Sequence, residues 1–355
     1  MLKTNQVNMQ ISNIDLIKYK GKGFTGLANL GNTCFLNSSM QVMHHMYEIN
    51  DVLDKIKFTN SEDGSLINEW NELRNLMWEN NGVISPNKFV HGVHILASKK
   101  GKEIFTGWAQ NDMPEFLMFI MDCIHNALKR PVNMKINGSP KTKTDKTAIE
   151  CYKLLQNAYS SEYSEIMNLC YGIYVTTLTT MDNKKTHSIR PEQYFILNLE
   201  VLSETGEQLL NLEDCFRHFT KYEDMIGDNA WFNEKTGEKE DIKKNIRFWN
   251  FPNILVITLK RFSIDGQRKI QNLIQFPLDG LDLSEHVIGY NSKSYIYDLF
   301  GICNHMGSVM GGHYTSFVKN YDNQWLHYND TTVEKIDNPS TVITNAAYCL
   351  FYRKR

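Results

Sequence analysis

The sequence has no excess of charge of one sign and no long apolar run. Its 38 Lys and Arg residues nearly balance its 40 Asp and Glu residues, so the charge does not favour nucleic acid or an anionic membrane surface as a partner. The longest apolar run, residues 254–259, has the length of a strand, whereas a membrane span needs about 20 apolar residues. We therefore expect neither a nucleic-acid partner nor a membrane partner.

A secretion signal and a disulfide framework are also missing. Residues 1–6, Met-Leu-Lys-Thr-Asn-Gln, contain no apolar segment of the kind that directs secretion. The seven cysteines are odd in number and widely scattered, which favours buried, reduced thiols over disulfides. These absences predict an intracellular protein, cytoplasmic or nuclear. The cysteines lie at positions 34, 123, 151, 170, 215, 303 and 349.

The sequence does contain enough apolar material for a large core. With 355 residues and 42% hydrophobic content, the chain is long enough for one large domain or two ordinary ones. Helical spacing dominates the first half, and β-branched and aromatic runs dominate from residue 171 onward, which predicts an α+β protein. We expect helices over 35–49, 112–128 and 212–219, a surface loop over 129–147, and strands over 172–180, 193–201, 247–251, 253–262 and 314–319.

Cys34 is the most distinctive cysteine, because it ends a polar, glycine-containing turn and begins an apolar helical pattern. A thiol at a helix N-terminus faces unpaired N–H groups and the positive end of the helix dipole, and both favour thiolate. A lone cysteine is by default a small buried hydrophobe. Because Gly31, Asn32 and Thr33 are poor core formers, we instead interpret Cys34 as a nucleophile. Asn29 would then be a donor to the oxyanion that forms when the thiolate attacks a carbonyl.

A cysteine nucleophile needs a base, and His313 is the best candidate. It follows Gly311 and Gly312, which allow substrate to approach closely, and precedes an alternating strand pattern that would hold the imidazole rigidly. A third group should accept a hydrogen bond from the imidazole Nδ1–H. Asn329 and Asp330 compete for this role, and only one of them can face the imidazole unless the strand ends there.

Two widely separated motifs resemble those of the ubiquitin-specific protease family. Residues 26–38, Gly-Leu-Ala-Asn-Leu-Gly-Asn-Thr-Cys-Phe-Leu-Asn-Ser, resemble its Cys box, and residues 311–316, Gly-Gly-His-Tyr-Thr-Ser, resemble its His box. With further similar segments, the resemblance extends over residues 23–353. It implies a papain-like cysteine protease fold with a helical thumb, a β palm and β fingers. These would form one catalytic domain at 22–355, after an N-terminal extension at 1–21.

The resemblance also implies roles for individual residues. Cys34 would be the nucleophile, His313 the base, and Asn29 an oxyanion donor. Spacing within the family motif favours Asn329 over Asp330 as the group that orients the imidazole, with Asp330 in support. The implied substrate-binding residues, for the C-terminal tail of ubiquitin, are Gln41, Asp112, Glu115, His305, Gly311, Gly312 and Tyr314.

Asp112 and Glu115 have two compatible explanations. They stand where an N-cap residue and its box partner would begin the helix over 112–128, with Pro114 in the first turn. Their segment, Gln-Asn-Asp-Met-Pro-Glu-Phe, also resembles the family's Gln-x-Asp-x-x-Glu-Phe motif, whose acidic residues contact the ubiquitin tail. Capping and substrate contact therefore both stay open.

One departure from the family pattern concerns metal. Many members bind a structural zinc at the finger tips through two Cys-x-x-Cys pairs. Here no two cysteines lie three residues apart, and Asn233 and Thr236 stand where the second pair is expected. Neither side chain is a zinc ligand. We predict metal-free fingers and no cofactor.

The implied function is that of a monomeric, thiol-dependent deubiquitinase. It would cleave the isopeptide or peptide bond after the C-terminal Gly-Gly of ubiquitin in ubiquitinated proteins, with Cys34 and His313 as a thiolate–imidazolium pair. A catalytically inert ubiquitin-binding scaffold is disfavoured, because no required residue is missing. A thiol hydrolase for another ubiquitin-like modifier shares the same chemistry. The sequence leaves the modifier and the chain linkage open.

Overall fold

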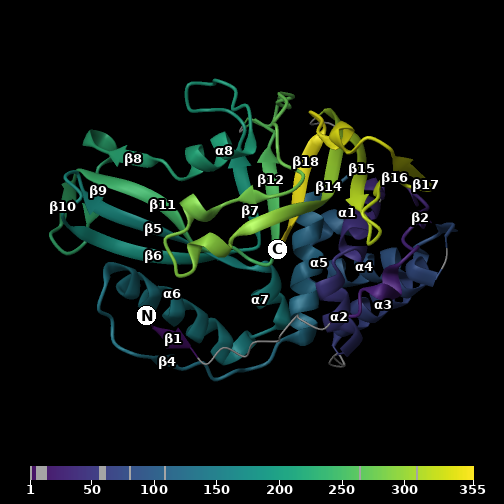
Figure 1. Cartoon of the computed structure of the whole chain (residues 1–355), viewed down its shortest axis with the longest axis horizontal. Helices are drawn as coiled ribbons and strands as arrows, with labels where there is room; N and C mark the ends of the chain where they lie inside the picture. The colour runs from purple at the N-terminus through teal and green to yellow at the C-terminus, as the bar shows by residue number, and fades with distance from the viewer. Residues whose placement is uncertain are drawn as a thin grey trace.

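A computed structural model describes residues 2–4, 14–55, 61–79, 81–107, 109–263, 265–308 and 311–355. Helices dominate the first half of the chain and strands the second (Figure 1), which confirms the α+β prediction. In these described parts, no helix is both long and apolar enough to cross a membrane. The helices are α1 (Cys34–His44), α2 (Tyr47–Lys55), α3 (Glu62–Glu79), α4 (Asn87–Lys99), α5 (Met113–Leu128), α6 (Lys143–Glu162), α7 (Glu165–Cys170) and α8 (Leu212–Phe219).

The strands form two main sheets and three short pairs. An eight-stranded sheet contains β7 (Ile196–Glu200), β12 (Ile254–Lys260), β13 (Leu281–Asp282), β14 (Ile296–Ser308), β15 (Gly311–Lys319), β16 (Trp325–Asn329), β17 (Thr332–Ile336) and β18 (Ala347–Lys354). A four-stranded sheet contains β5 (Gly172–Thr180), β6 (Thr186–Tyr194), β8 (Tyr222–Met225) and β11 (Ile242–Asn250). The short pairs are β1 (Lys3–Thr4) with β4 (Ile136–Asn137), β2 (Gly26–Leu27) with β3 (Val83–Ile84), and β9 (Trp231–Asn233) with β10 (Glu238–Glu240).

The eight-stranded sheet has the order β17-β16-β15-β14-β18-β12-β7, with β13 beside β14. It lies between the helices α1 to α5 and the four-stranded sheet (Figure 1). The helix α1 packs against β14, β15 and β16 on one side and against α5 on the other. This position explains why all of α1 is buried, and burial of its apolar side chains stabilises the junction of helices and sheet.

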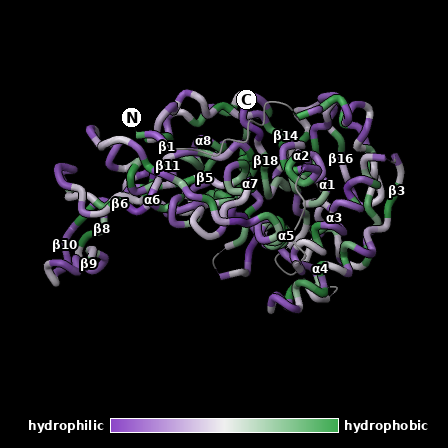
Figure 2. The backbone as a smooth tube through the Cα atoms, turned by 90° about the horizontal axis from the view of Figure 1, so that it is seen from below, coloured by the Kyte–Doolittle hydropathy of each residue, from purple (hydrophilic) through white to green (hydrophobic). Residues whose placement is uncertain are grey.

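The four-stranded sheet has the order β6-β5-β11-β8 and extends away from the helices. One of its faces is covered by α6, whose Ala148 and Cys151 pack with Ile173 and Val175 of β5. The hairpin of β9 and β10 projects from the body of the molecule at the far end (Figure 2). The molecule therefore has a helical part, a central sheet and a projecting sheet.

Several predicted elements differ from those observed. The helix over 35–49 ends at His44, and α2 begins at Tyr47. The strand over 193–201 is split between β6 and β7, which belong to different sheets. The last residues of the predicted loop over 129–147 belong to α6, where Thr142 and Asp145 form a capping box. By contrast, the short helix predicted over 212–219 is confirmed with the same bounds as α8.

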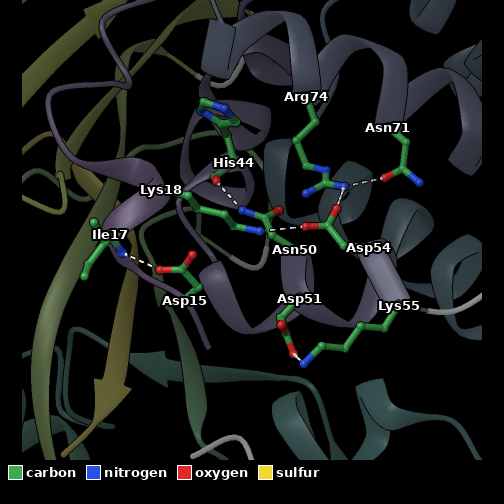
Figure 3. A network of polar contacts seen from close by, with 10 residues as sticks. All are labelled: Asp15, Ile17, Lys18, His44, Asn50, Asp51, Asp54, Lys55, Asn71 and Arg74. Atoms are coloured by element: carbon green, nitrogen blue, oxygen red, sulfur yellow. Dashed lines mark hydrogen bonds and ion pairs between the residues drawn. The ribbon is translucent and has the colours of Figure 1, made fainter. Parts of the chain in front are cut away.

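The N-terminal extension packs on the rest of the chain through Leu2 and Tyr19, whereas residues 15–18 are exposed; residues 1 and 5–13 of that prediction lie outside the described residues. Tyr19 is 2% exposed, and its ring lies 4.6 Å from that of Tyr47 and 4.5 Å from that of Trp78, centroid to centroid. Lys18 Nζ lies 2.8 Å from Asp54 Oδ2 (Figure 3). Burial of Tyr19 between two rings is the main attachment, since exposed ion pairs contribute little.

Asp54 also neutralises a buried cation. Its Oδ1 accepts a hydrogen bond of 2.6 Å from Arg74 Nη2, and Arg74 is 2% exposed (Figure 3). Burial alone raises the pKa of the Asp54 carboxyl, but hydrogen bonds from Lys18 and Arg74 outweigh burial and leave that pKa below its ordinary value.

Replacing Asp54 with alanine is expected to lower the free energy of unfolding by about 3 kcal/mol, because Arg74 keeps a buried charge without its counter-ion. Asp51→Ala, one turn earlier on α2, removes a pair with Lys55 whose lysine is exposed, and should cost less than about 1 kcal/mol. Urea unfolding measures both. Because Asp54 has a lowered pKa in the folded state, its contribution should be lost as pH falls through that pKa. Equal losses in the two variants would contradict this assignment.

Candidate functional site

Cys34 is the first residue of α1, as the sequence predicts, and it is 3% exposed. The helix α1 packs on β15, and the backbone of Tyr314 on that strand lies near enough to the sulfur to lower the pKa of the thiol. Tyr314 directly follows His313, so the thiol meets the strand that carries the imidazole. All seven cysteines are free thiols, and all are buried, as the sequence predicts.

The pKa of the Cys34 thiol is raised above its ordinary value. Burial is the main cause, and the negative charge of Asp330 adds to it, whereas backbone N–H groups of Tyr314, Phe35 and Cys34 lower it. The helix N-terminus therefore acts in the expected direction, but burial outweighs it. The expectation of a favoured thiolate is wrong for the unliganded protein, and the thiol needs a base to become a nucleophile.

His313 is held by an amide carbonyl. Its Nε2 lies 2.7 Å from Oδ1 of Asn329, the last residue of β16, and β16 pairs with β15. The sequence predicts this contact at Nδ1, and that prediction is wrong. With Nε2 occupied by Asn329, Nδ1 is the ring nitrogen left for the thiol. His313 also lies within β15, which begins at Gly311, and not ahead of the strand.

Asp330 directs its carboxylate to other partners. Oδ2 accepts a hydrogen bond of 3.0 Å from Asn29 Nδ2, and Oδ1 accepts one of 2.8 Å from Asn37 Nδ2. Asp330 has a φ of 47°, in the left-handed region that ends β16. Because the strand ends here, two adjacent residues serve different neighbours: Asn329 contacts His313, and Asp330 contacts Asn29.

Asn29 is fixed within the loop that precedes Cys34. Its Oδ1 accepts hydrogen bonds from the backbone N–H groups of Gly31 at 3.0 Å and Thr33 at 3.1 Å. The Nδ2 group uses one hydrogen for Asp330 and carries a second, as a donor to an oxyanion requires.

A backbone contact joins the same loop to the end of β16. Leu27 N–H donates to Asp330 O at 2.8 Å. Gly26 allows this approach, because a Cβ there would lie 2.4 Å from Thr331 O. The loop before Cys34 is therefore attached to the strand that carries Asn329.

A pocket of about 260 Å³ is lined by the two residues that flank His313 in the sequence. It brings together five of the predicted substrate-binding residues, namely Asp112, His305, Gly311, Gly312 and Tyr314. Gln110, Asn111, Phe262 and Ser308 complete its lining. The pocket is thus built from β14, β15 and the segment that leads into α5. Its walls are largely rings and glycine backbone, which suits a slender ligand.

Asp112 stands at the N-cap position of α5, but its side chain makes no cap hydrogen bond. Its carboxylate accepts hydrogen bonds from Tyr348 Oη at 3.1 Å and, more weakly, from Tyr314 Oη at 3.5 Å. The residue reaches the surface, but these rings enclose its carboxylate, and this burial raises its pKa to about 6. Asp112 thus occupies the predicted N-cap position, but the capping bonds expected of it and of Glu115 do not form, and substrate contact stays a prediction.

Gly312 is constrained by close neighbours. A Cβ at this position would lie 2.3 Å from Met306 O and 2.4 Å from His305 Nε2. On its open side, Gln110 bonds both backbone groups: Gln110 Nε2 donates to Gly312 O at 2.9 Å, and Gly312 N–H donates to Gln110 Oε1 at 2.8 Å. Sequence reasoning missed this role of Gln110, although the residue lies in the motif that contains Asp112.

Gln110→Ala is expected to lower kcat/KM by about tenfold for the cleavage that the sequence resemblance implies, because the backbone just before His313 loses both side-chain bonds that position it. Asn111→Ala is the matched control, since Asn111 lines the same pocket but bonds only locally, to Ala109 O at 3.0 Å. Steady-state kinetics of both variants decide the point. A rise in kcat/KM for Gln110→Ala would show that the bridge obstructs the pocket.

Two predicted substrate-binding residues lie outside this pocket. Gln41 is 2% exposed, and its Nε2 donates to Thr25 O at 2.8 Å. The prediction for Gln41 is corrected on this ground, because a buried side chain inside α1 cannot reach a ligand. Glu115 is exposed on the first turn of α5, without a capping-box bond.

His305 is 4% exposed, and burial together with the charge of Lys269 lowers its pKa to about 4, so it is a neutral wall of the pocket.

At the tip of the projecting sheet, Asn233 and Thr236 bind a carboxylate. Asn233 Nδ2 and Thr236 Oγ1 both donate to Glu240 Oε1, at 2.6 and 3.2 Å. Within the described parts of the chain, no three His, Cys, Asp or Glu side chains form a group that could hold a metal ion. Hydrogen bonds thus connect the two strands where a zinc-bearing relative would use its metal.

Strong chelators are therefore expected to leave the melting temperature unchanged, because a structural zinc would contribute folding energy directly and its removal would be seen. Differential scanning fluorimetry with and without a chelator measures this. Stoichiometric zinc in elemental analysis of the purified protein, with a lower melting temperature after chelation, would overturn the prediction.

Comparison with known proteins gives the same picture over nearly the whole chain. The family model described as ubiquitin carboxyl-terminal hydrolase matches residues 25–352. Ubiquitin carboxyl-terminal hydrolase 2 of Homo sapiens is 33% identical over 349 residues, which cover 93% of this chain and 55% of that protein. The protein of that name from Gallus gallus is 30% identical and is matched over 93% of each chain. This chain thus spans about half the length of the Homo sapiens relative.

Solved structures show the same fold. A structure of the SAGA Ubp8/Sgf11/Sus1/Sgf73 DUB module bound to ubiquitin aldehyde has a TM-score of 0.71 at 22% identity, covering 95% of this chain and 70% of that one. A second structure of the module, bound to monoubiquitin, has the same TM-score and covers 94% of this chain and 70% of that one. At this identity the likeness establishes the architecture alone, and the thumb, palm and fingers expected from the sequence correspond to the helical part, the central sheet and the projecting sheet.

Proposed function

Because this chain belongs to the ubiquitin carboxyl-terminal hydrolase family, we propose that it is a thiol-dependent deubiquitinase in which Cys34 is the nucleophile, His313 the base and Asn329 the group that orients the base. The observation that carries the proposal is the convergence of three elements. The start of α1 places Cys34 against the backbone of Tyr314, and β16 places Asn329 Oδ1 2.7 Å from His313 Nε2. A cysteine, a histidine and an orienting acceptor are the groups that thiol hydrolysis requires.

In the proposed reaction, Cys34 gives its proton to His313 as its sulfur attacks the carbonyl carbon of the terminal glycine. The raised pKa of the thiol makes this transfer necessary, since little thiolate exists beforehand. Asn29 Nδ2 and backbone N–H groups at the start of α1 stabilise the oxyanion. His313 then protonates the leaving amine. In the second half, His313 takes a proton from water as the water oxygen bonds to the acyl carbon; the C–S bond then breaks, ubiquitin leaves with a free carboxylate, and the proton returns from His313 to the Cys34 sulfur.

The pocket beside His313 is where we place the C-terminal tail of ubiquitin. Gly312 cannot carry a side chain without meeting His305 and Met306, so the passage at this point is narrow. A narrow passage admits two glycines and excludes branched side chains. Asp112 and the exposed Glu115 supply carboxyl groups for the basic residues farther along the tail.

Covalent trapping tests this function. Ubiquitin carrying a thiol-reactive group in place of its C-terminal carboxyl should form a one-to-one adduct, located at Cys34 by peptide mass spectrometry. The other six cysteines are 0% exposed, against 3% for Cys34, and serve as internal controls. Absence of an adduct with the folded wild-type protein, or an adduct that persists in Cys34→Ala, would contradict the proposal. The same experiment with other ubiquitin-like modifiers tests the choice of modifier.

The inert-scaffold alternative is not favoured by these comparisons, because the relatives named above are hydrolases. The proposed partners are ubiquitin and ubiquitinated proteins. We also propose that the protein is intracellular and acts as a monomer. Light scattering of the purified chain can test whether it is a monomer.

A further inference from the structure

Six lysines surround a hollow on the side of the projecting sheet, away from the catalytic pocket. The hollow measures about 950 Å³ and lies between the first half of α6 and the turn that joins β5 to β6. We call this set the lysine hollow, and its cations are Lys141, Lys143, Lys146, Lys153, Lys184 and Lys185. In a chain with a formal net charge of −2, such a concentration of one sign marks a surface for a negatively charged partner.

The hollow contains few acidic groups. Glu150 lies in its lining and is paired with Lys153 at 2.9 Å, and Asp182 pairs with Lys184 at 3.2 Å. Asp145, at the start of α6, is 1% exposed and accepts hydrogen bonds from the backbone of Lys141 and Thr142. The Asp145 carboxylate is therefore bound by the N-terminal cap of α6 and does not pair with the lysines of the hollow through these bonds. The other four lysines are exposed: Lys141, Lys143 and Lys146 lie at or just before the start of α6, and Lys185 lies in the β5–β6 turn. An anionic ligand would relieve their mutual repulsion.

The hollow also borders the open edge of a sheet. Within the described chain, β6 is the outermost strand of its sheet and pairs only with β5. Thr186, His187, Ser188 and Ile189 of β6 line the hollow. Every second residue of an edge strand directs its backbone N–H and C=O outward, where another strand can pair. Pro191 lacks an N–H, so strand pairing cannot continue through it. The part of β6 open to pairing is therefore residues 186–190, which is about 17 Å long.

We propose that the lysine hollow is a docking site for an acidic segment of a partner protein, which binds in extended conformation along the outer edge of β6. Backbone pairing with residues 186–190 gives the segment its direction, and the lysines of α6 and of the β5–β6 turn pair with its Asp and Glu side chains. Lysine and proline at an edge also serve to prevent aggregation. That role alone does not require α6 to contribute three lysines to the same hollow.

The lining argues against nucleic acid as the occupant. It contains no Phe, Tyr or Trp for bases to stack on and no Arg for bidentate phosphate contacts. Its Thr, Ser and Asn side chains and its strand edge instead suit a peptide backbone. An oligonucleotide is therefore included in the test as the competing ligand.

Fluorescence anisotropy of the full chain tests the proposal with three probes. The first is a short labelled peptide of alternating Glu and Val, the second has the same Glu content with Pro in place of alternate Val residues, and the third is a thymidine oligonucleotide. The first peptide should bind most tightly, and its affinity should fall as salt increases. Tightest binding by the oligonucleotide, or equal binding by the Pro-containing peptide, would overturn the proposal.

A triple charge reversal locates the site. Lys143→Glu, Lys146→Glu and Lys184→Glu together should weaken binding of the first peptide at least about tenfold. The matched control reverses three exposed lysines elsewhere, Lys20, Lys102 and Lys293, and should change affinity less than about twofold. Cleavage of a ubiquitin amide should be unchanged in both variants, which also reports that they fold. Equal weakening by both sets would show a diffuse charge effect and overturn the assignment.

Discussion

Replacing Cys34 with alanine is expected to abolish hydrolysis of ubiquitin amides and to leave ubiquitin binding nearly unchanged. The sulfur is the only atom that forms the covalent intermediate in the proposed reaction, and a thiol that is 3% exposed offers little area for binding. Turnover measured with a fluorogenic ubiquitin amide should fall to background, while titration calorimetry with free ubiquitin gives a Kd within about twofold of wild type.

Cys303→Ala is the control for a general loss of thiol or stability. Cys303 is fully buried, and its Sγ contacts the backbone oxygen of Ser38, one turn after Cys34 on α1, at 3.6 Å. Its loss should cost stability and leave kcat/KM close to that of wild type. Turnover in Cys34→Ala comparable to that of wild type would remove Cys34 from the mechanism, and loss of activity in both variants would indicate a folding defect.

The local part of the site could be predicted because its signals are contained in short segments. The polar turn before an apolar helical pattern placed Cys34 at the first residue of α1, and a capped amphipathic octet defined α8 with the observed bounds. The two glycines and the alternating pattern likewise indicated a strand at His313, although the strand already begins at Gly311. In each case the determining residues are neighbours in sequence, so propensity and spacing were sufficient.

The remaining features depend on contacts between distant segments. Gln110 and Gly312 are 202 positions apart, and only the position of the segment before α5 beside β15 brings them together. The burial that raises the Cys34 pKa comes from surrounding elements and not from the helix N-terminus that the sequence displays. Gln41 is a polar residue just after the predicted Cys34 motif, but burial of α1 on all sides keeps its side chain away from a ligand. Sequence spacing cannot supply any of these facts.

The second large expected effect concerns Asn329, the residue that contacts His313 in preference to its neighbour Asp330. Asn329→Ala is expected to lower kcat about a hundredfold with little change in KM, because the imidazole loses the acceptor that fixes its tautomer and direction. Asn329→Asp should retain most of the activity, since a carboxylate oxygen can accept the same hydrogen bond from Nε2. Steady-state kinetics on a fluorogenic ubiquitin amide measure all three proteins.

Asp330→Asn is the matched partner of these variants and should behave differently. It should lower kcat by only about tenfold, through a weaker hold on Asn29. It should also move the pH profile of Cys34 alkylation to lower pH, because the Asp330 charge raises the pKa of the thiol and its removal lowers that pKa. Asn329→Ala should lack this shift, since no charge is lost. A near-null kcat in Asp330→Asn beside a mild Asn329→Ala would reverse the two roles, and an alkylation profile that does not move would show that the carboxylate charge does not reach the sulfur.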